Sequence, residues 1–191
     1  ETGQALTALL VQLKVLEHLP DIESVANHAR ELREVVVQLL DEVRRLARDL
    51  RPSTLDNLGL VPTLDWYIQS YARKTHIDTH FRARIPDGFR LPLHTELALY
   101  RVTQEALTNV ARHADATRAS VWLELDDDVI RLGVEDNGCG FDIESTLNSQ
   151  DRSLGLLGIQ ERVDIIGGTF SLHSTAGKGT NLEVEVAVSP S

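Results

Sequence analysis

Residues that could bind a metal ion and phosphate recur at one-turn spacing within residues 105–113 (EALTNVARH). Glu105 and Asn109 are four residues apart, so on a helix both side chains leave the same face. A carboxylate and an amide oxygen together suit a hydrated Mg²⁺, which prefers oxygen ligands and keeps several waters. Arg112 and His113, about one turn further on, could contact phosphates. The alternative is a solvated helix face with an ordinary ion pair.

Glycines follow a carboxylate closely in residues 136–142 (DNGCGFD), directly after a predicted strand. Gly138 and Gly140 let the backbone approach a ligand closely or take a positive φ. Asp136, at the end of the strand, can accept a hydrogen bond from an exocyclic amine such as that of adenine. A plain hairpin-like turn is the alternative, because Asn-Gly is the usual signal for one.

A second glycine cluster, residues 155–159 (GLLGI), opens a predicted helix. A helix N-terminus offers free backbone N–H groups and a positive dipole end to phosphates, and Gly155, Leu156 and Gly158 stand in that position. The spacing is neither the dinucleotide-binding pattern nor a Walker loop. By itself this cluster therefore does not specify a phosphate site.

A third glycine cluster, residues 177–180 (GKGT), precedes the last predicted strand. Lys178 could contact a phosphate, Gly179 belongs to the same turn, and Thr180 could support Asp136 in binding a base. A glycine-rich hairpin explains the same residues equally well.

The elements that must position these clusters are predicted from hydrophobic periodicity. After residue 60, stretches with apolar residues at helical spacing are followed by stretches in which apolar and polar residues alternate, and this predicts a mixed α/β region. Its expected helices are 61–75, 93–113 and 156–166, and its expected strands are 77–84, 119–125, 130–135, 169–174 and 181–188.

The first fifty residues have only helical periodicity, broken once at Pro20 and Asp21. Apolar residues at spacings of three and four predict one helix before this break and another over residues 22–50. Such a helical hairpin cannot bury both apolar stripes alone, so we expect a second copy to complete a four-helix bundle. Pro52 ends the second helix, and residues 53–60 have the composition of a linker.

Composition excludes several classes of protein. A net charge of −10 argues against nonspecific nucleic-acid binding, because no surplus of cations is available to displace counterions. Cys139 is the only cysteine, so no internal disulfide is possible. No apolar run is long enough to span a bilayer. The chain contains no methionine and starts inside an amphipathic pattern, so we expect it to be the cytoplasmic portion of a longer protein with a possible membrane anchor elsewhere.

Together the clusters resemble the N, G1 and G2 boxes of the ATPase superfamily shared by histidine kinases, DNA gyrase and the Hsp90 chaperones. Residues 50–60, 105–114 and 156–168 further resemble the sensor histidine kinases that signal through nitrate-sensor-type regulators. The opening residues 1–6 (ETGQAL) resemble those just after that family's phospho-accepting histidine. The resemblance covers essentially the whole chain.

This resemblance implies a fold of class α then α/β. Residues 1–52 would form the antiparallel dimerisation hairpin, a phosphotransfer domain that lacks its acceptor histidine. Residues 53–60 would be a linker, and residues 61–191 a GHKL (Bergerat) α/β sandwich that binds ATP.

The resemblance also implies roles for single residues. Asn109 and Glu105 would hold Mg²⁺ and assist catalysis, and Gln4 would position water during dephosphorylation, although a solvent-facing helix residue is an equal alternative for Gln4. Residues 143–153 would form a lid over the phosphates. The implied nucleotide-binding residues are Asn109, Arg112, His113, Asp136, Gly138, Gly140, Gly155, Leu156, Gly158, Lys178, Gly179 and Thr180.

The implied activity is phosphorylation of a histidine from Mg-ATP, followed by transfer to an aspartate of a response-regulator receiver domain, without direct DNA binding. The histidine and aspartate expected immediately before Glu1 are not in this sequence. An inert nucleotide-binding dimerisation module therefore stays open as an alternative. An ATPase or chaperone of the same superfamily is a second alternative.

Overall fold

The computed structural model describes residues 28, 29, 32, 36, 53–143 and 150–188, and the chain divides into two compact units, Glu1–Arg51 and Pro52–Ser191. In the first unit, the described residues His28, Ala29, Leu32 and Val36 are helical, as expected for a helix over residues 22–50. The hairpin turn and Gln4 lie outside the described residues.

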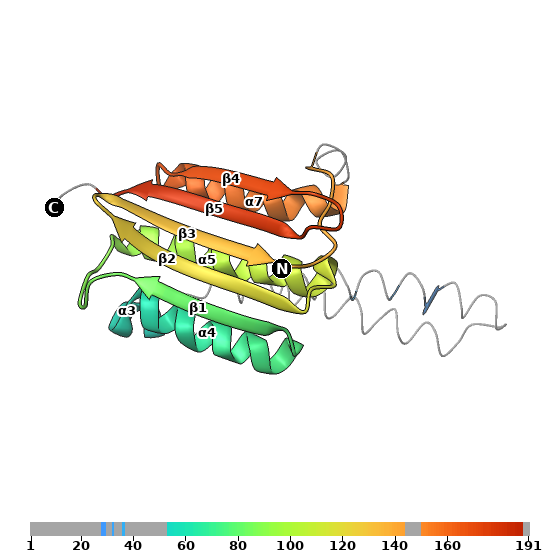
Figure 1. Cartoon of the computed structure of the whole chain (residues 1–191), viewed down its shortest axis with the longest axis horizontal. Coiled ribbons are helices and arrows are strands. Elements are labelled where there is room, and N and C mark those ends of the chain that lie inside the picture. Colours follow the sequence, from blue (N-terminus) through green and yellow to red (C-terminus); the bar gives the residue numbers. More distant parts are fainter. Residues whose placement is uncertain (1–27, 30–31, 33–35, 37–52, 144–149, 189–191) are drawn as a thin grey trace. The chain divides into compact units, whose positions relative to one another are not determined.

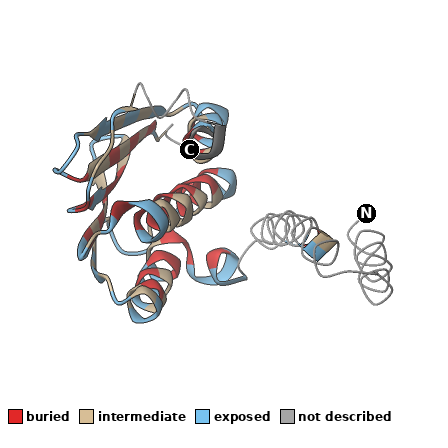
Figure 2. Ribbon diagram, turned by 90° about the vertical axis from the view of Figure 1, so that its right-hand side faces the viewer, coloured by how far each residue is buried: buried red, intermediate tan, exposed pale blue. Residues whose placement is uncertain are grey.

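The second unit is a two-layer sandwich with one sheet and its helices on a single face (Figure 1). Seen along the sheet, the buried residues lie between the two layers, and the outer face of the sheet is open (Figure 2). The elements are α3 (Ser53–Leu58), α4 (Leu60–Thr75), β1 (Asp78–Arg84), α5 (Leu93–Asn109), η1 (Val110–Ala114), β2 (Arg118–Asp126), β3 (Val129–Asp136), α7 (Gln150–Ile165), β4 (Thr169–Ser174) and β5 (Thr180–Ala187).

The sheet has the strand order β1-β2-β3-β5-β4. β1 is parallel to β2, whereas the β2–β3, β3–β5 and β5–β4 pairs are antiparallel. Asp136 is the last residue of the central strand, paired with Ala119 on one side and Thr180 on the other. The register thus places a carboxylate at the end of the sheet's middle strand, between two fixed neighbours.

The core forms because alternate residues of β2, β3 and β5 face the helices. The same period leaves mostly polar side chains on the opposite face, where Trp122 lies over Gly133 of the neighbouring strand. Burying each large aliphatic side chain contributes roughly 1.5–3 kcal/mol. The fully buried side chains that join the two layers include Leu64, Ile68, Leu99, Val102, Leu107, Val121, Leu123, Ile130, Leu132, Ile159, Val163 and Val184.

The α/β sandwich expected from the sequence is confirmed, and α4 and all five strands lie within a few residues of their expected positions. Two helices differ. α7 begins at Gln150 instead of Leu156, so the expected lid over 143–153 is partly helical, and residues 144–149 lie outside the described residues. The helix expected to run to His113 changes at Val110 into a π-helical turn.

The linker expected over residues 53–60 is wrong for most of its length. Residues Ser53–Leu58 form the helix α3, whose Leu55 is fully buried. Arg90 fastens this helix by donating to the Leu55 carbonyl oxygen at 3.2 Å. Only Gly59, with a φ of 86°, has the turn conformation that the composition suggested. Burial of Leu55 in the core therefore stabilises a helix in a segment whose composition favours a turn.

Arg90 also makes a two-pronged ion pair with Glu96, from Nε at 2.8 Å and from Nη2 at 3.0 Å. The Glu96 side chain is 1% exposed and that of Arg90 is 43% exposed. Losing the pair therefore has unequal consequences for its two members, because the guanidinium can turn to water and the carboxylate cannot.

We expect Arg90→Met to lower the Tm more than Glu96→Gln does, since it leaves a buried carboxylate without its cation. The double variant Arg90→Met/Glu96→Met should recover part of the loss. Thermal unfolding followed by circular dichroism compares the three variants. An equal or larger loss for Glu96→Gln would show that the carboxylate reaches water by another route.

Candidate functional site

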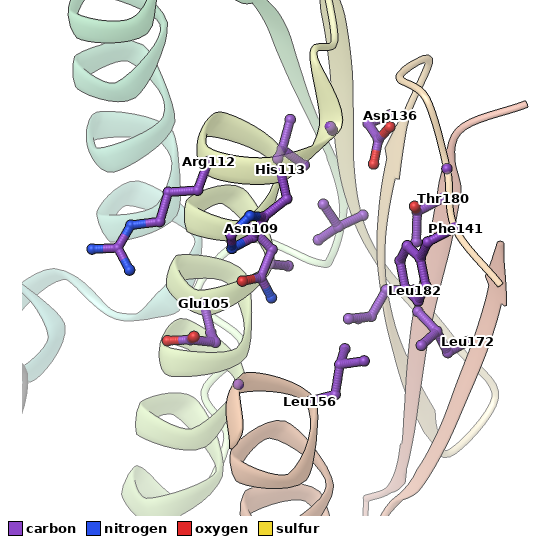
Figure 3. A pocket seen from close by; sticks show the side chains of 16 residues that line it. Glu105, Asn109, Arg112, His113, Asp136, Phe141, Leu156, Leu172, Thr180 and Leu182 are labelled. Carbon is purple, nitrogen blue, oxygen red and sulfur yellow. The ribbon is translucent and has the colours of Figure 1, made fainter. Parts of the chain in front are cut away.

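A pocket opens between the helical layer and one end of the sheet, with α5, η1 and α7 on one side and β3, β4 and β5 on the other (Figure 3). It encloses about 900 Å³, including its mouth. The lining residues are Glu105, Ala106, Asn109, Val110, Arg112, His113, Ala114, Val134, Asp136, Gly140, Phe141, Gly155, Leu156, Leu172, Thr180 and Leu182.

Asp136 supplies the buried charge of the pocket, with 7% of its surface exposed. Its Oδ1 accepts a hydrogen bond from the Gly138 N–H at 2.7 Å. Burial raises the pKa of Asp136 above its ordinary value, against the opposing effect of hydrogen bonds from Gly138 and Thr180. Figure 3 shows the carboxyl group directed from the strand into the pocket. A fixed, poorly hydrated acceptor in this place suits an amine donor on a flat ligand.

The loop after Asp136 is held by backbone hydrogen bonds to two other segments. The Cys139 N–H donates to the Ala114 carbonyl of η1 at 2.6 Å. The Cys139 carbonyl accepts from the Gly177 N–H at 2.6 Å, which joins the loop to the turn between β4 and β5. The Phe141 N–H donates to Ser174 Oγ at 2.9 Å. The end of η1, the loop after β3 and the turn between β4 and β5 are therefore joined by hydrogen bonds into one unit around the pocket.

Two glycines are required by this unit. Gly140 has a φ of +57°, and a Cβ there would lie 2.1 Å from the Thr175 carbonyl oxygen. Gly179 has a φ of +79°, and a Cβ there would lie 2.0 Å from the carbonyl oxygen of Asp136. Any side chain would push the turn away from the strand that carries the carboxylate.

Glu105 and Asn109 share a face of α5, as their spacing predicted, and both face the second turn of α7. A Cβ at Gly155 would lie 3.0 Å from Glu105 Oε1 and 3.7 Å from both terminal atoms of Asn109. Glycine at position 155 lets α7 approach these two side chains closely. A carboxylate and an amide oxygen thus meet at the mouth of the pocket, across from Asp136 (Figure 3).

Most of the site residues expected from the sequence line this pocket. They are Glu105, Asn109, Arg112, His113, Asp136, Gly140, Gly155, Leu156 and Thr180. Gly138, Gly158, Lys178 and Gly179 are not among the lining residues. Gly138 packs instead on η1, where a Cβ would lie 2.2 Å from the Ala114 carbonyl oxygen.

One expectation about the site needs correction. Gly155 was expected at a helix N-terminus, but α7 starts five residues earlier, so position 155 is not at the end with free N–H groups. Arg112 lines the pocket from η1 with an exposed side chain that points away from the strands, so its contact with phosphates stays a prediction (Figure 3). The π-helical turn beginning at Val110 changes the direction of the side chains that follow it.

Apart from Leu156, the apolar wall of the pocket was missed by reasoning from polar motifs. Phe141, Leu172 and Leu182 line it on the strand side, and Leu156 closes it from α7 (Figure 3). The alternation of β4 and β5 did contain the signal, since residues 172 and 182 are paired neighbours on the helix-facing side. The pocket therefore combines a flat apolar wall with one buried acceptor.

Two family models match this chain. Residues 94–190, which include every lining residue, match the family described as histidine kinase-, DNA gyrase B- and HSP90-like ATPase. The chain belongs to this ATPase family. Residues 1–55 match a second model, described as histidine kinase.

Curated relatives are sensor histidine kinases. The chain is 34% identical over 189 residues to the signal transduction histidine-protein kinase/phosphatase DegS of Brevibacillus brevis, covering 97% of this chain and 48% of that protein. It is 30% identical over 185 residues to the oxygen sensor histidine kinase NreB of Staphylococcus carnosus, covering 97% of this chain and 52% of that protein. The chain thus spans about half the length of these relatives.

Solved structures share the fold. The histidine kinase AdeS of Acinetobacter baumannii matches with a TM-score of 0.61 at 15% identity, over 97% of this chain and 96% of that chain. The histidine kinase domain of the blue-light activated kinase of Erythrobacter litoralis matches with a TM-score of 0.58 at 18% identity, over 97% and 94% of the two chains.

Substitution of Asp136 should change the pH dependence of stability. Because its pKa is raised in the folded ATPase domain, the folded state holds this proton to a higher pH than the unfolded chain, in which Asp titrates near about 3.9. The linked stability is full below that value and is lost as pH rises through the raised pKa.

We therefore expect the unfolding free energy of Asp136→Asn to improve relative to wild type as the pH is raised above about 4, the ordinary value for an aspartate. Denaturant unfolding at several pH values measures the difference. A difference that stays constant with pH would mean that Asp136 titrates normally.

Gly179→Ala should cost more stability than Gly177→Ala. Both glycines have a positive φ in one turn, but a Cβ at Gly177 meets nothing within 4 Å. Backbone strain alone costs about 1–2 kcal/mol, and the clash with the Asp136 carbonyl raises the loss at Gly179 to roughly 2–4 kcal/mol. Urea denaturation checks the order, and equal losses would show that the turn shifts freely.

Proposed function

We propose that this chain is the ATP-binding and dimerisation portion of a two-component sensor histidine kinase. The kinase transfers the γ-phosphoryl group of ATP to a histidine and then to an aspartate of a response-regulator receiver domain. The observation that carries the proposal is Asp136, a buried carboxylate fixed at the end of the central strand and directed into an otherwise apolar part of the pocket.

Adenine fits the strand side of the pocket. Its flat face packs against apolar side chains such as Phe141, Leu172 and Leu182, which exclude water. Its exocyclic amine donates to the Asp136 carboxylate, and Thr180 on the paired strand stands beside that acceptor. An ionised acceptor that is already oriented binds a donor more strongly than a neutral or mobile one. The residues at the ends of β3 and β5 therefore determine which base binds.

The triphosphate then lies toward α5, η1 and α7. Asn109 and Glu105 supply the amide and carboxylate oxygens that suit Mg²⁺, and glycine at position 155 leaves room for α7 beside both side chains. Bound Mg²⁺ would neutralise the charge on the transferring phosphoryl group. His113 lines the same wall of the pocket with an exposed side chain.

The remaining parts of the proposal follow from the family. The hairpin of residues 1–52 forms a homodimer and presents the docking surface for the receiver domain, and the chain does not bind DNA directly. In the described part of the chain, no helix is long and apolar enough to cross a membrane. We assign the chain to the cytoplasmic side of its parent protein.

Calorimetry with Mg-ATP tests the pocket. Wild type should bind, and Asp136→Asn should bind roughly 10- to 100-fold more weakly, because it removes one charge-assisted hydrogen bond. Asp127→Asn is the matched control, an exposed aspartate in the turn between β2 and β3 whose φ of 52° asparagine also accepts. Absence of binding by wild type would refute the proposed nucleotide site.

The metal and kinase parts have separate tests. Asn109→Ala should weaken binding in Mg²⁺ and have a smaller effect in EDTA, if its amide oxygen holds the ion. Phosphoryl transfer requires the parent protein with its acceptor histidine, incubated with ATP labelled at the γ-phosphate. An acid-labile label on the protein supports the kinase. ATP binding without any such label supports an inert module.

A further inference from the structure

The hydroxyl of Ser174, the last residue of β4, makes three polar contacts at the end of the sheet that carries Asp136. Its Oγ accepts a hydrogen bond from the Phe141 N–H at 2.9 Å. The same Oγ lies 3.1 Å from the Gly179 carbonyl oxygen and 3.1 Å from Thr180 Oγ1. Ser174 is not among the residues that line the pocket, so it does not touch the proposed nucleotide. Its contacts are instead with residues that do line the pocket or form its turn.

Ser174, Thr180 and Asp136 form one row across the strands β4, β5 and β3. The register pairs Ser174 with Thr180 and Thr180 with Asp136. Residues paired in this way have Cβ atoms about 4.5–5.5 Å apart. Figure 3 shows Thr180 next to Asp136 at this end of the pocket, and the Thr180 hydroxyl is one of the groups that hydrogen-bond the carboxylate. Ser174 is therefore connected to Asp136 through a single hydroxyl group.

The charge of Asp136 sets the direction of the hydrogen bonds in this row. A hydroxyl has one proton, so Thr180 donates either to the carboxylate or to Ser174. Hydrogen bonds to a charged acceptor are stronger than those between neutral groups, so the Thr180 proton goes to the ionised carboxylate. This donation polarises Thr180 Oγ1, which makes it a better acceptor for Ser174 than the Gly179 carbonyl oxygen at the same distance.

We infer that Ser174 is a positioning residue, whose hydroxyl donates to Thr180 Oγ1 and so commits the Thr180 proton to the Asp136 carboxylate. With that proton committed, this end of the pocket offers acceptors to the base and no hydroxyl donor. The inference rests on the proposed function and deepens it, because it assigns a residue outside the pocket that favours a base with an amine over one with a carbonyl oxygen at the same position.

The charged groups around Asp136 stay in place when Ser174 is changed. Burial is the largest cause of the raised pKa of Asp136, and Glu135, which precedes it on β3, adds to the increase. Other charged or titratable residues of the pocket and of the turn before β5 are Glu105, Arg112, His113 and Lys178. Substitution of Ser174 by alanine removes no charge, so a shift in the titration of Asp136 can be assigned to the lost hydroxyl.

A carbon-13 NMR titration of the aspartate carboxyl groups without nucleotide tests the row, with Asp136→Asn used to assign the Asp136 signal. Ser174→Ala should raise the titration midpoint of Asp136, because the ionised form loses part of its support. Ser174→Thr keeps a hydroxyl and should restore the wild-type midpoint. Ser171→Ala is the matched control, since Ser171 is an exposed serine of the same strand.

The same titration in a Thr180→Val background shows whether Ser174 acts through Thr180. Adding Ser174→Ala to Thr180→Val should leave the Asp136 midpoint where Thr180→Val alone puts it, because the connecting hydroxyl is already absent. A separate effect of Ser174 on the shape of the strand end would instead add to that of Thr180→Val.

Calorimetry with ATP and with inosine triphosphate connects the row to binding. Inosine triphosphate carries a carbonyl oxygen in place of the adenine amine, so it needs a donor where ATP needs an acceptor. Wild type should prefer ATP. Ser174→Ala should lower the ratio of the two affinities roughly 3- to 10-fold, since the Thr180 proton can then turn to the carbonyl oxygen. A purely structural role of Ser174 would weaken both nucleotides equally and leave the ratio unchanged.

An unchanged Asp136 midpoint in Ser174→Ala, an equal shift in Ser171→Ala, or an unchanged ratio of nucleotide affinities would overturn the inference. Failure of wild type to bind either nucleotide would count against the proposed function instead. The NMR titration needs no nucleotide, so it would still decide the role of Ser174.

Discussion

The close backbone contact around Asp136 is the constraint on which the rest of the site depends. The end of η1, the loop after β3 and the turn before β5 exchange hydrogen bonds through Cys139, and no side chain fits between them at Gly140 or Gly179. These contacts are between main-chain atoms, so they fix the carboxylate regardless of which side chains line the pocket. A binding residue held in this way needs little reorganisation when a ligand arrives.

The two buried carboxylates of the α/β unit differ in how they are neutralised. Glu96 is paired with both nitrogens of an arginine fork and also accepts from the Leu91 N–H at 3.3 Å. Asp136 receives only hydrogen bonds from neutral groups, and burial raises its pKa. A buried charge that the fold leaves without a cation costs stability, and such a cost is typical of functional positions. The first carboxylate holds α3 in place, and the second is available to a ligand.

The polar and apolar parts of the pocket come from different layers. α5 supplies a carboxylate and an amide at its last turns, whereas β3, β4 and β5 supply an apolar wall and one acceptor at their ends. Neither layer forms the pocket alone, because Glu105 and Asn109 come from the helical layer and Asp136 comes from the sheet. The π-helical turn at Val110–Ala114 joins them, because it brings the Ala114 carbonyl to the loop that follows Asp136.

The sequence alone determined the order of elements and the residues that could do chemistry. Periods of 3.6 and 2 are local, so α4, the five strands and the shared face of Glu105 and Asn109 followed from spacing. The glycine clusters also marked the loops that meet at the pocket. Local spacing, however, gives no information on which distant groups meet.

Features that depend on contacts between residues far apart in the chain were decided only by the tertiary structure. The helical state of residues 53–58 follows from the burial of Leu55 and the contact of Arg90 with its carbonyl. The roles of Gly138 and Gly179 as packing residues follow from the carbonyl oxygens of other segments. In each case the deciding contact joins residues far apart in the chain, and its energy outweighs the small local preferences that sequence patterns report.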